Sequence, residues 1–123
     1  IESIWEAWLA LTQIEAIRHG TSQADYKRDY IQFHAVMINA FGYAVQRLMA
    51  DHSIVDIVQM IEDLASNAGS SDMEDFFLIS RWGGICVNTE KDRPTIIASV
   101  PAQKSAAERL VKVILAKSLE ELL

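Results

Sequence analysis

The sequence predicts a mainly α-helical (α+β) fold: four or five helices around a long central helix, with a short β-hairpin near 85–100 before the C-terminal helix. Three observations support this prediction. Apolar residues recur at helical spacing over most of the chain, a stretch of the first half carries no charge, and two β-rich runs flank a polar turn near the end. With 123 residues, half of them apolar, residues 1–123 are expected to form a single helical domain.

The first helix is predicted over residues 3–19. Ser3 and Glu6 match a capping box, and Gly20 suits the left-handed position that follows a last helical turn. The apolar side of this helix is broad and comprises Ile4, Trp5, Trp8, Leu9, Leu11, Ile14 and Ile17.

The second helix is predicted to begin at Thr21 or Ser22 and to continue to about Met49. One apolar stripe comprises Tyr26, Tyr30, Phe33, Met37, Ala40 and Ala44. An adjacent stripe comprises His34, Ile38, Phe41, Val45 and Leu48. Two stripes indicate two helical neighbours, and Gly42 between them indicates a close crossing or a kink. A helix of about 40 Å is long for a chain of this size, so a homodimer that uses part of it is expected.

The segment Ile31–Gln46 contains no Asp, Glu, Lys or Arg. A membrane span needs about 20 predominantly apolar residues, and this run is shorter. It also contains Gln32, His34 and Asn39, whose polar groups are costly in hydrocarbon. The segment is therefore expected to be a buried helix, and no membrane attachment is expected.

A third helix is predicted from the Ser53–Asp56 cap signal to a stop at Asn67–Gly69. The next segment, over residues 73–82, has four consecutive apolar residues and fits a short helix capped by Ser71 or a strand equally well.

Two short strands are predicted at the runs ICVNT and TIIASV, which the turn EKDRP joins into a hairpin. The final helix starts at Pro101. Its inward residues are expected to be Ala106, Leu110, Val113, Ile114 and the later leucines.

The net charge of −6 is concentrated in the middle of the chain. Between Leu48 and Ser80 there is no Lys or Arg, and the acidic residues are Asp51, Asp56, Glu62, Asp63, Asp72, Glu74 and Asp75. Nucleic acids and anionic lipids require clustered cations, so neither is an expected partner. The acidic stretch is either a solvated face, paired with the basic last helix, or a docking surface for a basic protein.

The sequence offers little for catalysis or metal binding. The pairs Glu15–His19 and His52–Asp56 sit four residues apart, but helix-terminal charges explain them better than a metal site does. Cys86 lies in an apolar strand, where a lone cysteine usually fills the core. No phosphate-binding loop or catalytic serine motif occurs. We therefore expect no enzymatic activity and no cofactor.

The leading hypothesis is a small acidic regulator or antagonist that binds another protein, such as a transcription regulator or a toxin, as a homodimer. The candidate partner-binding residues are Trp5, Trp8, Tyr26, Tyr30, Phe33, Met37, Asp56, Glu62 and Asp63. Toxin neutralisation would use the acidic residues of the third helix, whereas sequestering a regulator would use the tryptophans or the Tyr26 stripe.

Two alternatives remain open at this point. One is a structural subunit of a larger assembly. The other is a small-molecule-binding protein or minor enzyme, with a pocket lined by His34, Asn39, Tyr43 and Cys86. The single cysteine and the lack of a signal-peptide pattern favour a cytoplasmic location.

Overall fold

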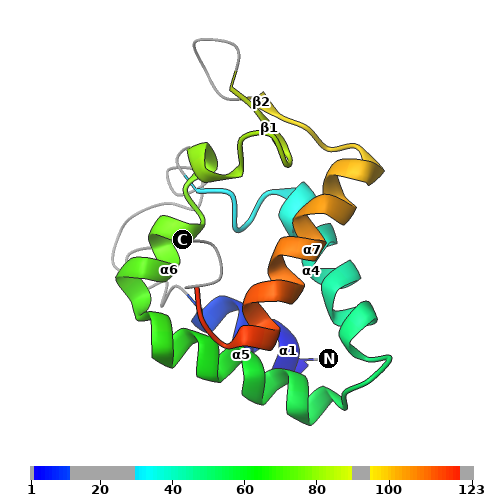
Figure 1. Ribbon diagram of the computed structural model, residues 1–123, viewed down its shortest axis with the longest axis vertical. Helices are drawn as coiled ribbons and strands as arrows, with labels where there is room; N and C mark the ends of the chain where they lie inside the picture. Colours follow the sequence, from blue (N-terminus) through cyan, green and yellow to red (C-terminus); the bar gives the residue numbers. More distant parts are fainter. Residues whose placement is uncertain (1, 12–29, 90–94, 120–123) are drawn as a thin grey trace.

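The computed structural model describes residues 2–11, 30–89 and 95–119. The prediction of a mainly helical fold with a small antiparallel hairpin before the C-terminal helix is confirmed (Figure 1). In chain order the elements are α1 (Glu2–Ala10), α4 (Ala35–Leu48), α5 (Ile54–Ala68), α6 (Ser70–Phe76), the 3-10 helix η1 (Ile79–Trp82), β1 (Val87–Asn88), β2 (Thr95–Ile96) and α7 (Val100–Ala116).

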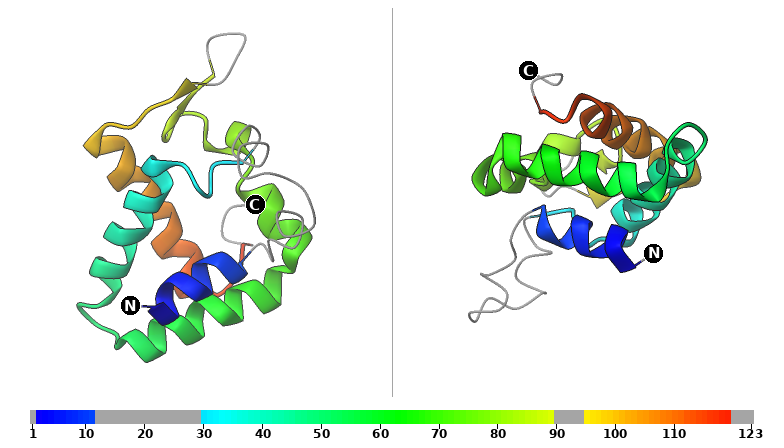
Figure 2. Two further views of the ribbon diagram at one scale, coloured as in Figure 1. Left: turned by 180° about the vertical axis from the view of Figure 1, so that it is seen from behind. Right: turned by 90° about the horizontal axis from the view of Figure 1, so that it is seen from below.

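The helices form a layered body, and the hairpin projects from one end of it (Figure 1). Helices α4 and α7 pack against each other, and α5 contacts α7 on one side and α1 on the other. In the view from below, α5 accordingly lies between α7 and α1 (Figure 2). Both α4 and α7 contribute buried alanines, and such small side chains allow two helices to approach closely. These alanines are Ala40, Ala44, Ala102, Ala106 and Ala107.

The first helix differs from the prediction at its start. Helix α1 begins at Glu2, so Ser3 lies within its first turn and the predicted Ser3 cap is wrong. The predicted continuation over residues 12–19 lies outside the described residues.

The long central helix is the main correction to the predicted fold. Its second half is helical as α4, but residues 30–34 are not helical, and the predicted part over residues 21–29 lies outside the described residues. Here the Ile31 N–H donates to the carbonyl of Phe77 at 2.7 Å, and Tyr30 forms an isolated antiparallel bridge with Leu78. This backbone pairing with a distant segment competes with the helix, because the same N–H groups cannot serve both. The 14 residues of α4 span about 21 Å, so length no longer argues for a homodimer.

The third helix is confirmed together with its cap. The Ser53 hydroxyl accepts a hydrogen bond from the Asp56 N–H at 3.2 Å, and Gly69 ends α5 with a φ of 81°. The ambiguous segment that follows is helical: α6 ends at Phe76, and η1 follows it. Because α6 begins at Ser70, Ser71 lies inside the helix and does not cap it.

The hairpin and the last helix also match the prediction. Val87 pairs with Ile96 and Asn88 with Thr95. Ser99 caps α7 by accepting from the Ala102 N–H at 3.3 Å. The predicted inward residues of α7 are buried. Of the later leucines, Leu115 is exposed against the expectation, Leu119 packs partly buried against the core, and Leu122 and Leu123 lie outside the described residues.

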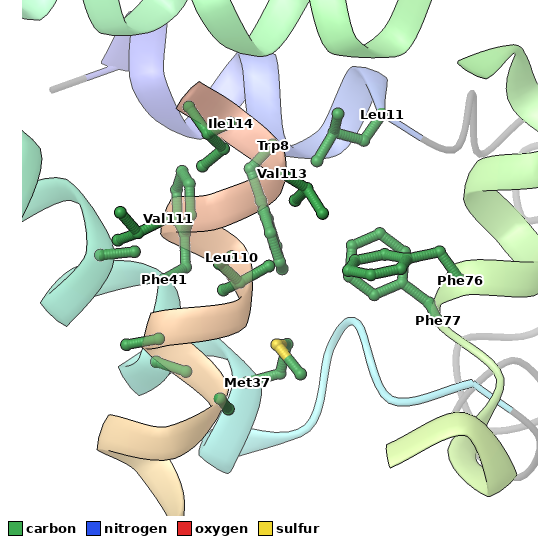
Figure 3. Close-up of a cluster of buried hydrophobic side chains, with 14 of the residues drawn as sticks. Trp8, Leu11, Met37, Phe41, Phe76, Phe77, Leu110, Val111, Val113 and Ile114 are labelled. Carbon is green, nitrogen blue, oxygen red and sulfur yellow. The ribbon is translucent and has the colours of Figure 1, made fainter. Parts of the chain in front are cut away.

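The core collects side chains from every described helix. Figure 3 shows the part of it between α1, α4, α6 and α7. Trp8 of α1 is fully buried and lies between Phe41 of α4 and Phe77, which follows α6. Leu110 and Val113 of α7 line the same interior. No helix within the described ranges is long and apolar enough to cross a bilayer.

Candidate protein-binding surface

The exposed side of α5 carries three of the predicted partner-binding residues. The helical period places Asp56, Gln59 and Asp63 along one line, and Val55 and Glu62 along the next. Asp56 and Glu62 are exposed, and Asp63 is partly exposed. We refer to Asp56, Glu62 and Asp63 as the acidic surface.

Within the described residues, Asp63 is the member of the acidic surface whose charge is partly compensated. The Lys117 ammonium lies 4.0 Å from an Asp63 carboxylate oxygen, and the Gln59 amide donates to Asp63 at 2.9 Å. The Lys117 carbonyl accepts from the Asn67 amide at 2.7 Å, so the end of α7 is held against α5. Asp56 and Glu62 have no ion pair with any residue that the structure describes.

In the part of the chain that the structure describes, no cation of α7 forms an ion pair with the acidic surface. The Arg109 guanidinium donates to the Arg81 carbonyl at 2.8 Å and lies 4.9 Å from the centre of the Trp82 ring. Lys104 lies in a groove with residues of α4, and Lys112 is exposed. The basic last helix therefore leaves most of the acidic surface unneutralised.

Exposed apolar side chains lie on neighbouring elements. Trp5 of α1 is 40% exposed, Met49 at the end of α4 is 49% exposed, and Val55 at the start of α5 is 78% exposed. The starts of α1 and α5 and the end of α4 lie at the same end of the molecule in all views (Figures 1 and 2). Acidic and apolar side chains are thus exposed on α1 and α5, which pack against each other, and at the nearby end of α4.

The remaining predicted binding residues are less accessible. Trp8, Phe33 and Met37 are buried in the core, Tyr30 is half-buried, and Tyr26 lies outside the described residues. The structure therefore brings Trp5 and the acidic surface to the exterior and separates them from most of the aromatic stripe.

Sequence reasoning missed Val55 and Met49. Val55 departs from the spacing of the buried stripe of α5, where Ile57, Ile61 and Leu64 face the core. An apolar residue off the buried stripe of an amphipathic helix was the available signal for it.

Among the described residues, the four residues predicted to line a small-molecule pocket do not share one groove. Asn39 and Tyr43 line a shallow groove between α4 and α7, which includes neither His34 nor Cys86. Cys86 is buried, and this burial raises the pKa of its thiol to about 11, although the nearby Arg109 guanidinium opposes the shift. Such a thiol is a poor nucleophile at neutral pH. No three His, Cys, Asp or Glu side chains of the described segments are arranged to hold a metal ion.

No protein-family model, curated protein or solved structure matches the chain.

Proposed function

We propose that the protein is a small acidic regulator that binds and inhibits a basic protein. The observation that carries the proposal is the exposed, largely unneutralised acidic surface of α5. Uncompensated surface charge of one sign accelerates encounters with an oppositely charged partner and disfavours partners of like charge.

Apolar groups beside the charges support binding rather than mere solvation. Charged groups steer and orient a partner, while affinity comes mainly from apolar anchors, among which tryptophan is prominent. Trp5 and Val55 provide such anchors on α1 and α5, the two helices that pack side by side. Of the two hypotheses from the sequence, this arrangement favours neutralisation of a basic protein, for example a toxin, over sequestration through the aromatic stripe.

The first experiment is capture of the partner from a lysate of the source cells, at about 0.05 M and about 0.5 M salt. A single basic partner, bound in fixed proportion at low salt and weakened at high salt, is the expected result. Absence of any specific partner under both conditions would count against the proposal.

The captured partner then allows a test of the surface itself. The double variant Asp56→Asn/Glu62→Gln removes two charges with little change in shape. It is expected to lower the association rate constant about tenfold and to reduce its salt dependence. The matched control Asp72→Asn/Asp75→Asn removes two exposed carboxylates elsewhere, on α6. Equal effects of the two double variants would refute a specific role for α5.

A third variant separates steering from anchoring. Trp5→Ala is expected to increase the dissociation rate and to leave the association rate nearly unchanged, because an apolar anchor acts after the encounter. An unchanged dissociation rate would remove Trp5 from the binding surface.

A further inference from the structure

Helix α4 has an outward face without charge, on the side opposite its core residues. It consists of the exposed residues Ala35, Ile38, Asn39, Gly42 and Gln46 and the half-buried Tyr43. The helical period places all six within about 140° of arc. We refer to these six residues as the neutral face.

A groove runs between the neutral face and α7. Its central part is lined by Ile38, Gly42, Tyr43 and Gln46 of α4 and by Gln103 of α7. The groove continues past Tyr43 and Gln46 to an end that is bordered by Arg47 of α4 and by Lys104, Ala107 and Glu108 of α7. Its centre is therefore neutral, whereas one end carries charges of both signs.

Gly42 is not required by the fold of a single chain. A Cβ atom placed on Gly42 would meet no described atom within 4 Å, and Gly42 is not among the residues with positive φ. A glycine inside a helix lowers stability by roughly 0.5–1 kcal/mol relative to alanine. A glycine that is costly within the monomer is useful where another backbone approaches the helix closely.

Charge identifies which partner fits the groove. Each chain carries a net charge of −6, so two copies repel each other least where the meeting surfaces carry no charge. In a two-fold contact the same patch serves both copies, and the patch must be complementary to itself. The neutral centre meets this condition. The charged end of the groove is compatible with this condition, because it carries both an acidic residue, Glu108, and two basic residues, Arg47 and Lys104.

We propose that the neutral face binds a second copy of this chain, with the two α4 helices crossing near Gly42. The contact is independent of the acidic surface of α5, so the two surfaces can be occupied at the same time. A basic protein, by contrast, is not attracted electrostatically to the neutral face, because this face carries no negative charge.

Sedimentation velocity of the 123-residue chain, from about 1 to about 200 µM, tests the proposal. The wild-type chain is expected to sediment at twice its 13.8 kDa mass over the upper part of this range. Gln46→Glu and Gly42→Glu each place one extra negative charge per copy in the contact. Each is expected to raise the dissociation constant at least tenfold.

The matched control is Ser66→Glu, which adds the same charge to the exposed side of α5 and is expected to leave the dimer intact. Far-UV circular dichroism and thermal unfolding at low concentration establish that the variants are folded. At these exposed helix positions glutamate is a better helix former than glycine and about equal to glutamine, so a folded monomer is the expected state.

Two results would overturn the proposal. One is a wild-type chain that stays monomeric at the highest concentration. The other is a dimer that neither Gln46→Glu nor Gly42→Glu weakens more than Ser66→Glu does, because such a dimer uses a different surface. Neither result bears on the acidic surface, because the double variant Asp56→Asn/Glu62→Gln is tested by its binding to a different protein.

Discussion

The indole ring of Trp8 stacks on the phenyl ring of Phe41, with the ring centroids 4.3 Å apart and the ring planes at 22°. Phe77 meets the same indole edge-on at a centroid distance of 5.2 Å. These contacts join α1 to α4 and to the segment after α6 (Figure 3). Helix α1 is thus part of the core, although its other tryptophan, Trp5, is 40% exposed.

The two tryptophans of α1 are expected to differ sharply in their contribution to stability. Trp8→Ala removes a fully buried ring and should lower the free energy of unfolding by about 3–5 kcal/mol. Trp5→Ala should cost less, about 1–2 kcal/mol, because that residue is already 40% exposed. Urea denaturation of the two variants gives both values, and similar losses would contradict the placement of Trp8.

Gln32 is a buried polar residue that ties the non-helical segment before α4 to α1. Its amide donates to the Trp8 carbonyl at 2.9 Å, and its side chain is 0% exposed. Gln32→Leu should lower the free energy of unfolding by about 1–3 kcal/mol, since the buried carbonyl loses a donor. The control Gln59→Leu, on the exposed side of α5, should change stability by no more than about 0.5 kcal/mol. An effect of Gln32→Leu as small as that of the control would show that the hydrogen bond from Gln32 to the Trp8 carbonyl does not stabilise the fold.

The Cys86 thiol is expected to be protected from chemical modification in the folded protein. It is also expected to lower the free energy of unfolding as the pH rises into the alkaline range. Burial raises its pKa from 9.0 to about 11, and Arg109 opposes part of the shift. Below pH 9 the thiol is neutral in both states. As the pH rises from 9 towards 11, the unfolded chain loses its proton first, so the native state is destabilised, by roughly 2 to 3 kcal/mol in total.

Denaturation of wild type and Cys86→Ala at several pH values between 8 and 11 isolates this contribution, because tyrosines and lysines titrate in both proteins. The difference between the two proteins should shrink as the pH rises. A thiol reagent at pH 8 should modify Cys86 only as fast as the native protein unfolds locally or globally and exposes the thiol. Rapid modification of the folded chain would show that Cys86 is accessible.

Replacement of two glycines by alanine is expected to change the stability of the protein in opposite directions. Gly69 has a φ of 81°, so Gly69→Ala is strained and should lower stability by about 1 kcal/mol or more. Gly42→Ala should raise it by about 0.5–1 kcal/mol, because the new Cβ meets no described atom within 4 Å. Thermal unfolding at a concentration where the chain is monomeric measures both shifts, and the same sign for both would contradict the prediction.

The elements whose ends are encoded locally could be predicted from the sequence. The hydroxyl of Ser53 and the glycine at 69 define both ends of α5 within a few residues of the helix. The hairpin was predictable from two β-rich runs around a polar turn, and the last helix from Pro101 and its apolar spacing.

The central helix could not be delimited in this way. Its periodicity continues through residues 30–34, yet their backbone pairs with Phe77 and Leu78, which no local pattern reveals. The two tryptophans illustrate the same limit at the candidate site. Both fit the broad apolar side of α1, and only the packing of α4 and α5 determines that Trp8 is buried and Trp5 is partly exposed.

The backbone contact of Ile31 with Phe77 also has a consequence for the order of events during synthesis on the ribosome. Residues 30 and 31 emerge early, but their partners follow only after α4, α5 and α6. Closing this long loop costs entropy that local helix formation does not. A nascent chain can therefore form α5 with its cap while Ile31 still lacks its acceptor. Tyr30 and Ile31 reach their final positions only when the segment after α6 has been made.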